Sequence, residues 1–195
     1  MSILQTIDLK KHYGAEPNIT RALDGVNFSV DEGEFVAVVG TSGSGKSTLL
    51  HMMGGLDTPT SGTVIVRGEE LAKKNDEQLT IFRRRNIGFI FQNYNLVPIL
   101  NVYENIVLPV ELDGDTVDQK FLDETVHLLG LEDKLKNMPN NLSGNLDSRT
   151  SVEVLGLIKR TSAEFGQTVV MITHNNDVAC LADRIVRIED GRIVE

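Results

Sequence analysis

The sequence predicts an α/β fold with a largely parallel sheet, and two observations carry this prediction. The run Glu34–Val39 is short, apolar and rich in valine, which is typical of a strand buried on both faces. In the last third of the chain, strand-like and helix-like segments alternate, as they do when crossover helices join parallel strands. An antiparallel β portion near the N-terminus and a small helical insertion complete the fold that we expect.

The individual elements follow from local patterns along the chain. Alternating or short apolar runs predict strands at Ile3–Leu9, Val26–Val30, Glu34–Val39, Gly62–Gly68, Ile87–Phe91, Thr168–Thr173 and Arg184–Ile188. Helical patterns occur at Ser47–Met53, Asp76–Arg85, Ser148–Phe165 and Asn176–Ala182. We therefore expect residues 1–195 to form a single domain.

Residues 93–141 form the predicted insertion, a small helical subdomain within that domain. Thr116 and Gln119 have the spacing of a capping box, which marks the start of a helix. Apolar residues then recur at helical intervals, at Phe121, Leu122, Val126 and Leu129.

Charge and cysteine content narrow the possible functions. The net charge is −9 and the pI is near 4.9, which argues against nucleic acid as a partner because such domains are usually basic. Cys180 is the only cysteine, so no internal disulfide can form, which suits a reducing compartment. Residues 1–8 do not resemble a signal peptide, and no apolar run approaches the ~20 residues of a membrane span. We expect any membrane role to come through a partner.

The strongest motif is the run Gly40-Thr-Ser-Gly-Ser-Gly-Lys-Ser47, which matches the phosphate-binding pattern G-x-x-x-x-G-K-S/T at every fixed position. Glycines let successive backbone N–H groups converge on phosphates, and the helix that follows adds its positive end. Lys46 is expected to reach the β- and γ-phosphates, and the Ser47 hydroxyl to ligate Mg²⁺. The motif therefore predicts a phosphate-loop NTPase core that binds a nucleotide with Mg²⁺.

Further stretches, in matching order along nearly the whole chain, resemble the ATP-binding-cassette (ABC) family. Gly88–Gln92 is similar to the family's Q-loop strand, Asn141–Gly144 to its signature and Asn145–Asp147 to its D-loop. Met171–His174 is similar to the strand that ends in the switch histidine, and Glu189–Ile193 to the turn near the C-terminus of the domain. Two more, Gly54–Gly62 and Phe91–Pro98, look most like the subgroup that serves lipoprotein release, macrolide export and antimicrobial-peptide export.

The resemblance implies roles for individual residues. Tyr13 would stack on the adenine, where an aromatic ring offers a flat face. Gln92 would contact Mg²⁺, together with Ser47, and the attacking water, and His174 would hydrogen-bond the γ-phosphate. The ATP-binding residues implied are Tyr13, Gly40, Thr41, Ser42, Gly43, Ser44, Gly45, Lys46, Ser47, Thr48, Ser143 and Gly144. Ser143 and Gly144 would address ATP held by a second copy, which implies a dimer with nucleotides between the subunits.

The resemblance also implies a membrane permease as partner, and hence a cytoplasmic protein that is peripheral on the inner face of the cell membrane. The run Tyr94–Tyr103 is unusually apolar for a segment that follows a polar glutamine. Two interpretations remain open: it packs within the helical insertion, or it forms a groove for a short helix of the permease.

One motif of the family has no counterpart in this sequence. The family carries, between signature and D-loop, a Walker B strand that ends in an Asp for Mg²⁺ and a Glu that polarises the attacking water. Here Leu142–Gly144 runs directly into Asn145–Asp147. Either the molecule lacks this strand, or the 195-residue sequence joins two stretches that a further segment separates. The second account is favoured, because loss of a central strand costs more than the ~5–15 kcal/mol by which domains are stable.

The expected function is that of an ATP-binding motor subunit, which couples ATP binding and hydrolysis to transport by the permease. A catalytically silent nucleotide-binding regulator is the alternative, because the Walker B Asp and Glu are absent. We expect this 195-residue sequence itself to hydrolyse ATP very slowly or not at all. A GTPase is disfavoured because the chain has no Asn-Lys pair with which to begin the base-reading motif.

Overall fold

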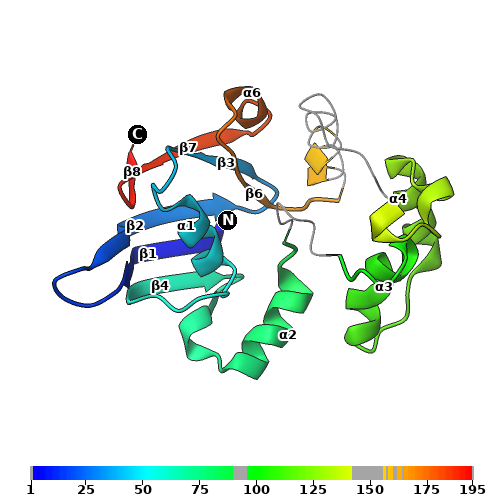
Figure 1. Ribbon diagram of the computed structural model, residues 1–195, viewed down its shortest axis with the longest axis horizontal. Coiled ribbons are helices and arrows are strands. Elements are labelled where there is room, and N and C mark those ends of the chain that lie inside the picture. The colour runs from blue at the N-terminus through cyan, green and yellow to red at the C-terminus, as the bar shows by residue number, and fades with distance from the viewer. Residues whose placement is uncertain are drawn as a thin grey trace. The chain divides into compact units, whose positions relative to one another are not determined.

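The computed structural model describes residues 2–89, 96–141, 156, 158–159, 162–163 and 165–194. The chain divides into two compact units (Figure 1): the first combines Met1–Arg83 with Ser148–Glu195, and the second is Arg84–Asp147. The boundaries predicted for the helical insertion, 93–141, lie within the second unit and remain a prediction.

An antiparallel sheet occupies the N-terminal part of the first unit, and it confirms the antiparallel portion that we expected. Its strand order is β2-β1-β4-β5, with β1 at Ser2–Tyr13, β2 at Thr20–Asp31, β4 at Ser61–Val66 and β5 at Glu69–Glu70. β1 and β2 are longer than predicted, because their ladder continues through polar residues to the pair formed by Tyr13 and Thr20. Such residues carry no apolar signal, although their backbone groups pair normally.

The second sheet is largely parallel, as predicted, and has the order β6-β3-β7-β8. Its strands are β3 at Phe35–Val39, β6 at Val169–Ile172, β7 at Arg184–Glu189 and β8 at Arg192–Val194. β3 pairs in parallel with both β6 and β7, whereas β8 pairs antiparallel with β7. Every residue of β3 is buried, with exposed fractions of 0–7%, as expected for a strand between two neighbours.

Helix α1 (Lys46–Met53) connects the two sheets of the first unit. It buries Leu49, Met52 and Met53 and contacts strands of both sheets, β1, β2 and β4 on one side and β6 on the other. The other elements are the 3-10 turn Leu71–Lys73, α2 (Asp76–Asn86) and the short α6 (Asn176–Ala179). α2 confirms the helix predicted at Asp76–Arg85.

The strand predicted at Ile87–Phe91 is wrong over its first three residues. Ile87–Phe89 form neither helix nor strand, and the last two residues lie outside the described part of the chain. An alternating apolar pattern becomes a strand only when a partner ladder is available, and sequence pattern alone does not show that partner.

The second unit is helical, with α3 at Val102–Leu112, α4 at Gln119–Leu129 and 3-10 turns at Glu132–Lys134 and Pro139–Asn141. Its core consists of Val107, Leu122 and Val126, with partly buried apolar residues packed around them. None of the helices in the described part of the chain has the length and hydrophobicity that a bilayer-spanning helix needs.

The capping box predicted at Thr116 and Gln119 is wrong. α4 begins at Gln119, and the N-cap is Asp118, whose carboxylate accepts a hydrogen bond from the Phe121 amide at 3.0 Å. Aspartate at the N-cap satisfies a free amide of the first turn in the way expected of a threonine, but here two residues further along the chain. The capping box is found instead at the start of α3, where Asn101 and Glu104 exchange side chain-to-backbone hydrogen bonds.

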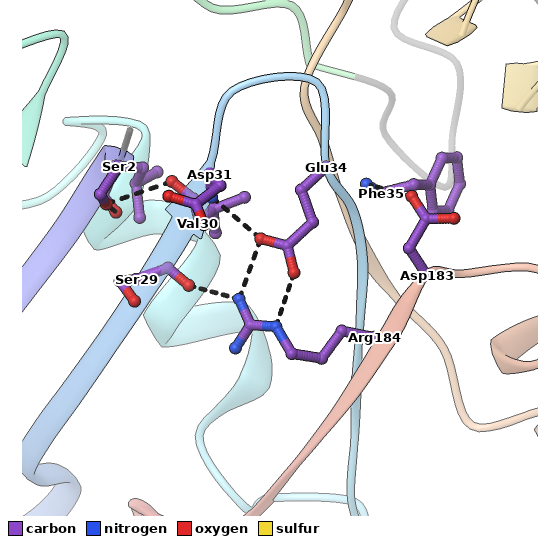
Figure 2. Close-up of polar contacts among 9 residues, drawn as sticks. Ser2, Ser29, Val30, Asp31, Glu34, Phe35, Asp183 and Arg184 are labelled. Atoms are coloured by element: carbon purple, nitrogen blue, oxygen red, sulfur yellow. Dashed lines mark hydrogen bonds and ion pairs between the residues drawn. The ribbon is translucent and has the colours of Figure 1, made fainter.

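A polar network holds together the starts of β3 and β7 (Figure 2). The Arg184 guanidinium donates to both carboxylate oxygens of Glu34, at 2.6 and 3.1 Å, and to the Ser29 carbonyl at 2.5 Å. The Asp183 carboxylate accepts from the Phe35 amide at 3.0 Å. The Arg184 hydrogen bond lowers the pKa of Glu34, and the Phe35 amide lowers the pKa of Asp183. The network therefore fixes the parallel register at the strand ends opposite the glycine loop.

Candidate functional site

The Gly40–Ser47 loop connects the end of β3 to the start of α1. α1 begins at Lys46, and its N-cap residue is Gly45, which has no side chain that could cap the first amides of the helix. The first turn also contains no acidic residue. These amides carry the positive end of the helix dipole. The end of α1 can therefore hold an anion such as a phosphate group.

Lys46 adds a full positive charge at the same place. Its ammonium donates to the carbonyl oxygens of Gly40 at 2.9 Å and Thr41 at 2.6 Å, with the Ser44 hydroxyl oxygen at 3.4 Å. The loop's own backbone therefore positions the cation at the loop. A compact ammonium at a helix N-terminus is suited to a polyphosphate.

Two glycines of the loop are required by their surroundings as well as by their backbone angles. A Cβ atom on Gly40 (φ 156°) would lie 2.2 Å from the Ile188 carbonyl oxygen, and one on Gly45 (φ 104°) would lie 2.3 Å from the Ala22 carbonyl oxygen. The loop therefore lies in close contact with β2 on one side and with the end of β7 on the other. Sequence reasoning did not identify Ala22 and Ile188, because both act through backbone oxygens from distant segments.

The turn between β7 and β8 is hydrogen-bonded to the phosphate loop. The Gly191 amide donates to the Ser44 carbonyl at 3.0 Å, and the Asp24 amide donates to the Gly191 carbonyl at 2.9 Å. Arg192 pairs with the Asp24 carboxylate at 2.7 Å and lowers its pKa. Because Arg192 balances the charge of Asp24, this acidic side chain does not oppose an anion at the loop.

A cavity of about 760 Å³ lies beside the loop, within the size range of small-molecule sites. Its walls come from the loop and α1, from the start of β2 and from the β7–β8 turn. The lining residues include Thr20, Ala22, Gly43, Lys46, Ser47 and Thr48. The structure thus gathers the central and C-terminal residues of the predicted loop around one cavity.

Tyr13 is the last residue of β1 and lies across the hairpin from Thr20. The residue is 42% exposed, and it does not line the cavity. Its hydroxyl donates to the Asp57 carboxylate at 2.9 Å. Burial of the hydroxyl, followed by this hydrogen bond, raises the pKa of Tyr13, so the phenol stays neutral at physiological pH.

His174 lies in the turn between β6 and α6 and is exposed. The parallel register of β3 and β6, with Val38 opposite Ile172, brings the carboxyl ends of both strands to the same edge of the sheet. His174 therefore follows its strand at the edge from which the loop also emerges, although it does not line the cavity. Gln92, Ser143 and Gly144 lie outside the described residues.

A metal ion at this site would need ligands beyond the described side chains. No group of three His, Cys, Asp or Glu residues in the described part of the chain could hold an ion by itself. Ser47 lines the cavity and supplies one hydroxyl. Mg²⁺ is commonly bound by one or two protein ligands together with substrate phosphates and water, so the residues present fit an ion that arrives with a nucleotide.

Comparison with known proteins identifies relatives over the whole chain. The ABC transporter family model matches residues 23–160. An uncharacterized ABC transporter ATP-binding protein of Thermotoga maritima is 39% identical and matches 98% of this chain and 93% of its own length. The lipoprotein-releasing system ATP-binding protein LolD of Geobacter metallireducens is 37% identical, over 99% of this chain and 98% of its own length. The chain spans only about a third (34%) of the macrolide export ATP-binding/permease protein MacB of Mannheimia succiniciproducens, at 34% identity.

A solved structure shows the same fold. The dimeric, post-hydrolysis state of the ATP-binding cassette MJ0796 bound to ADP and Pi aligns with a TM-score of 0.87 and 32% identity. The match covers 98% of this chain and 97% of that one.

The alignments also show that the relatives contain residues that this sequence does not. The alignment with the Thermotoga protein runs over 219 positions, although this chain has 195 residues. The LolD and MacB alignments run over 221 and 223 positions. At least 24 aligned positions, the difference between 219 and 195, therefore have no counterpart in this chain.

Proposed function

Because this chain belongs to the ABC transporter family of ATP-binding proteins, we propose that its Gly40–Ser47 loop binds ATP with Mg²⁺ and that it acts as the motor subunit of a membrane permease. The observation that carries this proposal is the start of α1, where uncapped amides and the Lys46 ammonium meet beside a nucleotide-sized cavity. Both features favour a polyphosphate.

The loop and the residues proposed to surround the nucleotide have separate roles in ATP binding. The amides of the loop and of the first turn of α1 bind the phosphates, and Lys46 neutralises the charge of the β- and γ-phosphates. The Ser47 hydroxyl and Gln92 hold Mg²⁺, which offsets the remaining phosphate charge. Tyr13 stacks on the adenine, and His174 contacts the γ-phosphate.

The site is completed by a second copy in this proposal. Ser143 and Gly144 address ATP that a second subunit holds. The relative MJ0796 forms a dimer with ADP and Pi bound, and this supports an arrangement with two nucleotide-binding subunits. The protein would work at the cytoplasmic face of the membrane through its permease.

The second unit supports the proposed permease contact. Leu96 and Ile99, within the apolar run Tyr94–Tyr103, are 42% and 80% exposed, and Ile106 and Leu112 of α3 are 37% and 62% exposed. Large apolar side chains that are exposed on this unit are available for contact with a protein partner. The names of the relatives, a lipoprotein-releasing system and an ATP-binding/permease protein, are consistent with such a partner.

Hydrolysis depends on a segment that this sequence does not contain. We propose that a segment of at least 24 residues, with the Asp and Glu of the Walker B strand, belongs between Gly144 and Asn145 in the working protein. The 195-residue chain keeps the phosphate loop but has no Walker B strand that ends in Asp and Glu, and so lacks the Glu expected to polarise the attacking water. It should therefore bind ATP and turn it over very slowly or not at all.

The test begins with the intact mass of the protein purified from its natural gene. A mass several kDa above 21.5 kDa, together with ATP turnover and co-purification with a membrane protein, is the expected result. A mass of 21.5 kDa with ATP binding, no turnover and no membrane partner would overturn the motor assignment in favour of a regulator. Rapid turnover by the pure 195-residue chain would overturn our account of the missing general base.

A further inference from the structure

The segment that follows α1, Asp57–Thr60, runs along the end of β1. The Thr60 amide donates to the Lys10 carbonyl at 2.8 Å, and the His12 amide donates to the Thr60 hydroxyl at 2.9 Å. The Lys11 ammonium donates to the Thr58 carbonyl at 2.7 Å. This segment thus continues the antiparallel pairing with β1 ahead of Ser61, the first residue of β4, and it fixes the strand end that carries Tyr13.

Asp57 is the centre of these contacts. One carboxylate oxygen accepts from the Lys11 ammonium and from the Thr58 amide, each at 2.7 Å, and the other accepts from the Tyr13 hydroxyl at 2.9 Å. The Lys11 side chain is only 13% exposed and that of Asp57 33%. The Lys11 hydrogen bond lowers the pKa of Asp57, so the carboxylate stays charged at neutral pH.

The Tyr13 ring is restrained at two points by this cluster. Asp57 holds its hydroxyl, and the Lys11 ammonium lies 4.9 Å from the ring centroid. A cation at this distance is attracted to the face of an aromatic ring. With the hydroxyl and one face engaged, the other face is the part of the ring that remains for a ligand.

The restrained ring lies at the border of the nucleotide cavity. Its ladder partner Thr20 lines that cavity. Thr48, which also lines it, is close enough for its side chain to act on the Tyr13 hydroxyl in the direction that lowers the pKa of Tyr13. Tyr13 is therefore linked to the residue that follows Ser47 in α1, and through Asp57 to the segment that follows α1.

We propose that Asp57 is a positioning residue for the nucleoside part of the nucleotide, which acts with Lys11 to fix the Tyr13 ring before the base arrives. This rests on the proposed ATP-binding function. A side chain that is already ordered loses less conformational freedom on binding. The effect should therefore fall on the base and not on the phosphates, which the loop binds by itself.

The experiment compares two ligands on the same variants by calorimetry. Asp57→Ala should weaken MgATP binding about 3- to 10-fold, the range expected for one side chain that must be immobilised on binding. Its affinity for inorganic tripolyphosphate, which has no base, should stay within twofold of the original protein. Tyr13→Phe, which keeps the ring and loses the hydroxyl, should show the same selective loss, and the double variant should show no further loss.

A surface carboxylate away from Tyr13 provides the matched control. Glu69 pairs with Lys74 on the surface of the same unit, and Glu69→Ala should leave both affinities unchanged. Unchanged ATP affinity in a folded Asp57→Ala variant, or equal losses for ATP and tripolyphosphate, would overturn the positioning role. Failure of the original protein to bind either ligand would overturn the proposed function itself.

Discussion

β3 and β6 are neighbouring strands of one parallel sheet, and they differ in burial although both are entirely apolar. All five residues of β3 are buried, whereas all four residues of β6 are only partly buried. β3 pairs with β6 on one side and β7 on the other, while β6 pairs only with β3 among the residues that the structure describes. Both strands are apolar in composition, so we attribute the difference in burial to the number of neighbouring strands with which each one pairs.

The edge of β6 that faces away from β3 can be located from its hydrogen bonds. The Val169 amide donates to the Glu34 carbonyl and the Thr173 amide to the Val38 carbonyl, so these amides point toward β3. Because successive residues of a strand alternate, the amides of Val170 and Ile172 point away from β3. An apolar strand with an outward row of amides presents an edge at which a further strand could pair, as our proposal of a further segment between Gly144 and Asn145 requires.

Charged substitutions in the two strands should show the largest difference. Val38→Asp buries a carboxylate at a position that is 0% exposed, and we expect it to cost more than about 4 kcal/mol and prevent folding. Val170→Asp places the same group on partly buried β6 and should cost about 1–2 kcal/mol. Urea unfolding measures both.

Alanine variants at the same two positions separate the cost of burying a charge from the cost of lost packing. Val38→Ala and Val170→Ala remove the same atoms without adding a charge, and Val38→Ala should again cost more. If both aspartate variants of the 195-residue chain fail to fold, β6 is covered in solution and the contrast between the strands is lost.

Substitutions in the turn after β3 should likewise destabilise the protein more than substitutions in the turn after β6. Gly40→Ala sets a methyl group against the Ile188 carbonyl, which should cost about 2–3 kcal/mol and abolish ATP binding in calorimetry. His174→Ala removes an exposed side chain and should change stability by less than about 0.5 kcal/mol.

Gly33→Ala is the control for the Gly40 substitution. Gly33 has a positive φ but no atom within 4 Å of the added methyl group, so this variant isolates the backbone strain. It should cost about 1–2 kcal/mol with ATP binding retained. Equal effects of the Gly40 and Gly33 substitutions would show that the Ile188 contact is unimportant.

Hydrogen exchange should detect the smallest difference, without any mutation. In the 195-residue chain, the amides of Val170 and Ile172 should exchange faster than those of Val169 and Thr173, since only the latter two are bonded to β3. NMR-detected exchange resolves these amides individually. Equal protection of all four would show that another strand occupies the outer edge of β6.

Local patterns were sufficient for much of the fold. The valine-rich run at β3, the glycine loop and the start of α1 near Lys46 were predicted, because each depends on neighbouring residues alone. The parallel sheet and the family were confirmed by the pairing of β3 and by the relatives. The roles of Tyr13 and His174 stay predictions.

Features that depend on distant segments were missed. The close approach of the loop to Ala22 and Ile188 involves only backbone oxygens, which no residue type in the sequence reveals. Asp57 lies in the stretch Gly54–Gly62, for which the resemblance implied a subgroup but no residue role, and its contacts with Lys11 and Tyr13 exist only after the sheet has formed. The wrong cap at Thr116 has a local cause, since Asp118 competes for the same helix start.

The dependence of the phosphate loop on the β7–β8 turn bears on when this protein becomes active during synthesis. Ribosomes deliver the loop long before Ile188 and Gly191, whose backbone groups contact it. A nascent chain therefore carries the complete nucleotide motif without the surface that shapes it. Nucleotide capture should accordingly wait until translation has passed the final hairpin, so that truncated products do not sequester ATP.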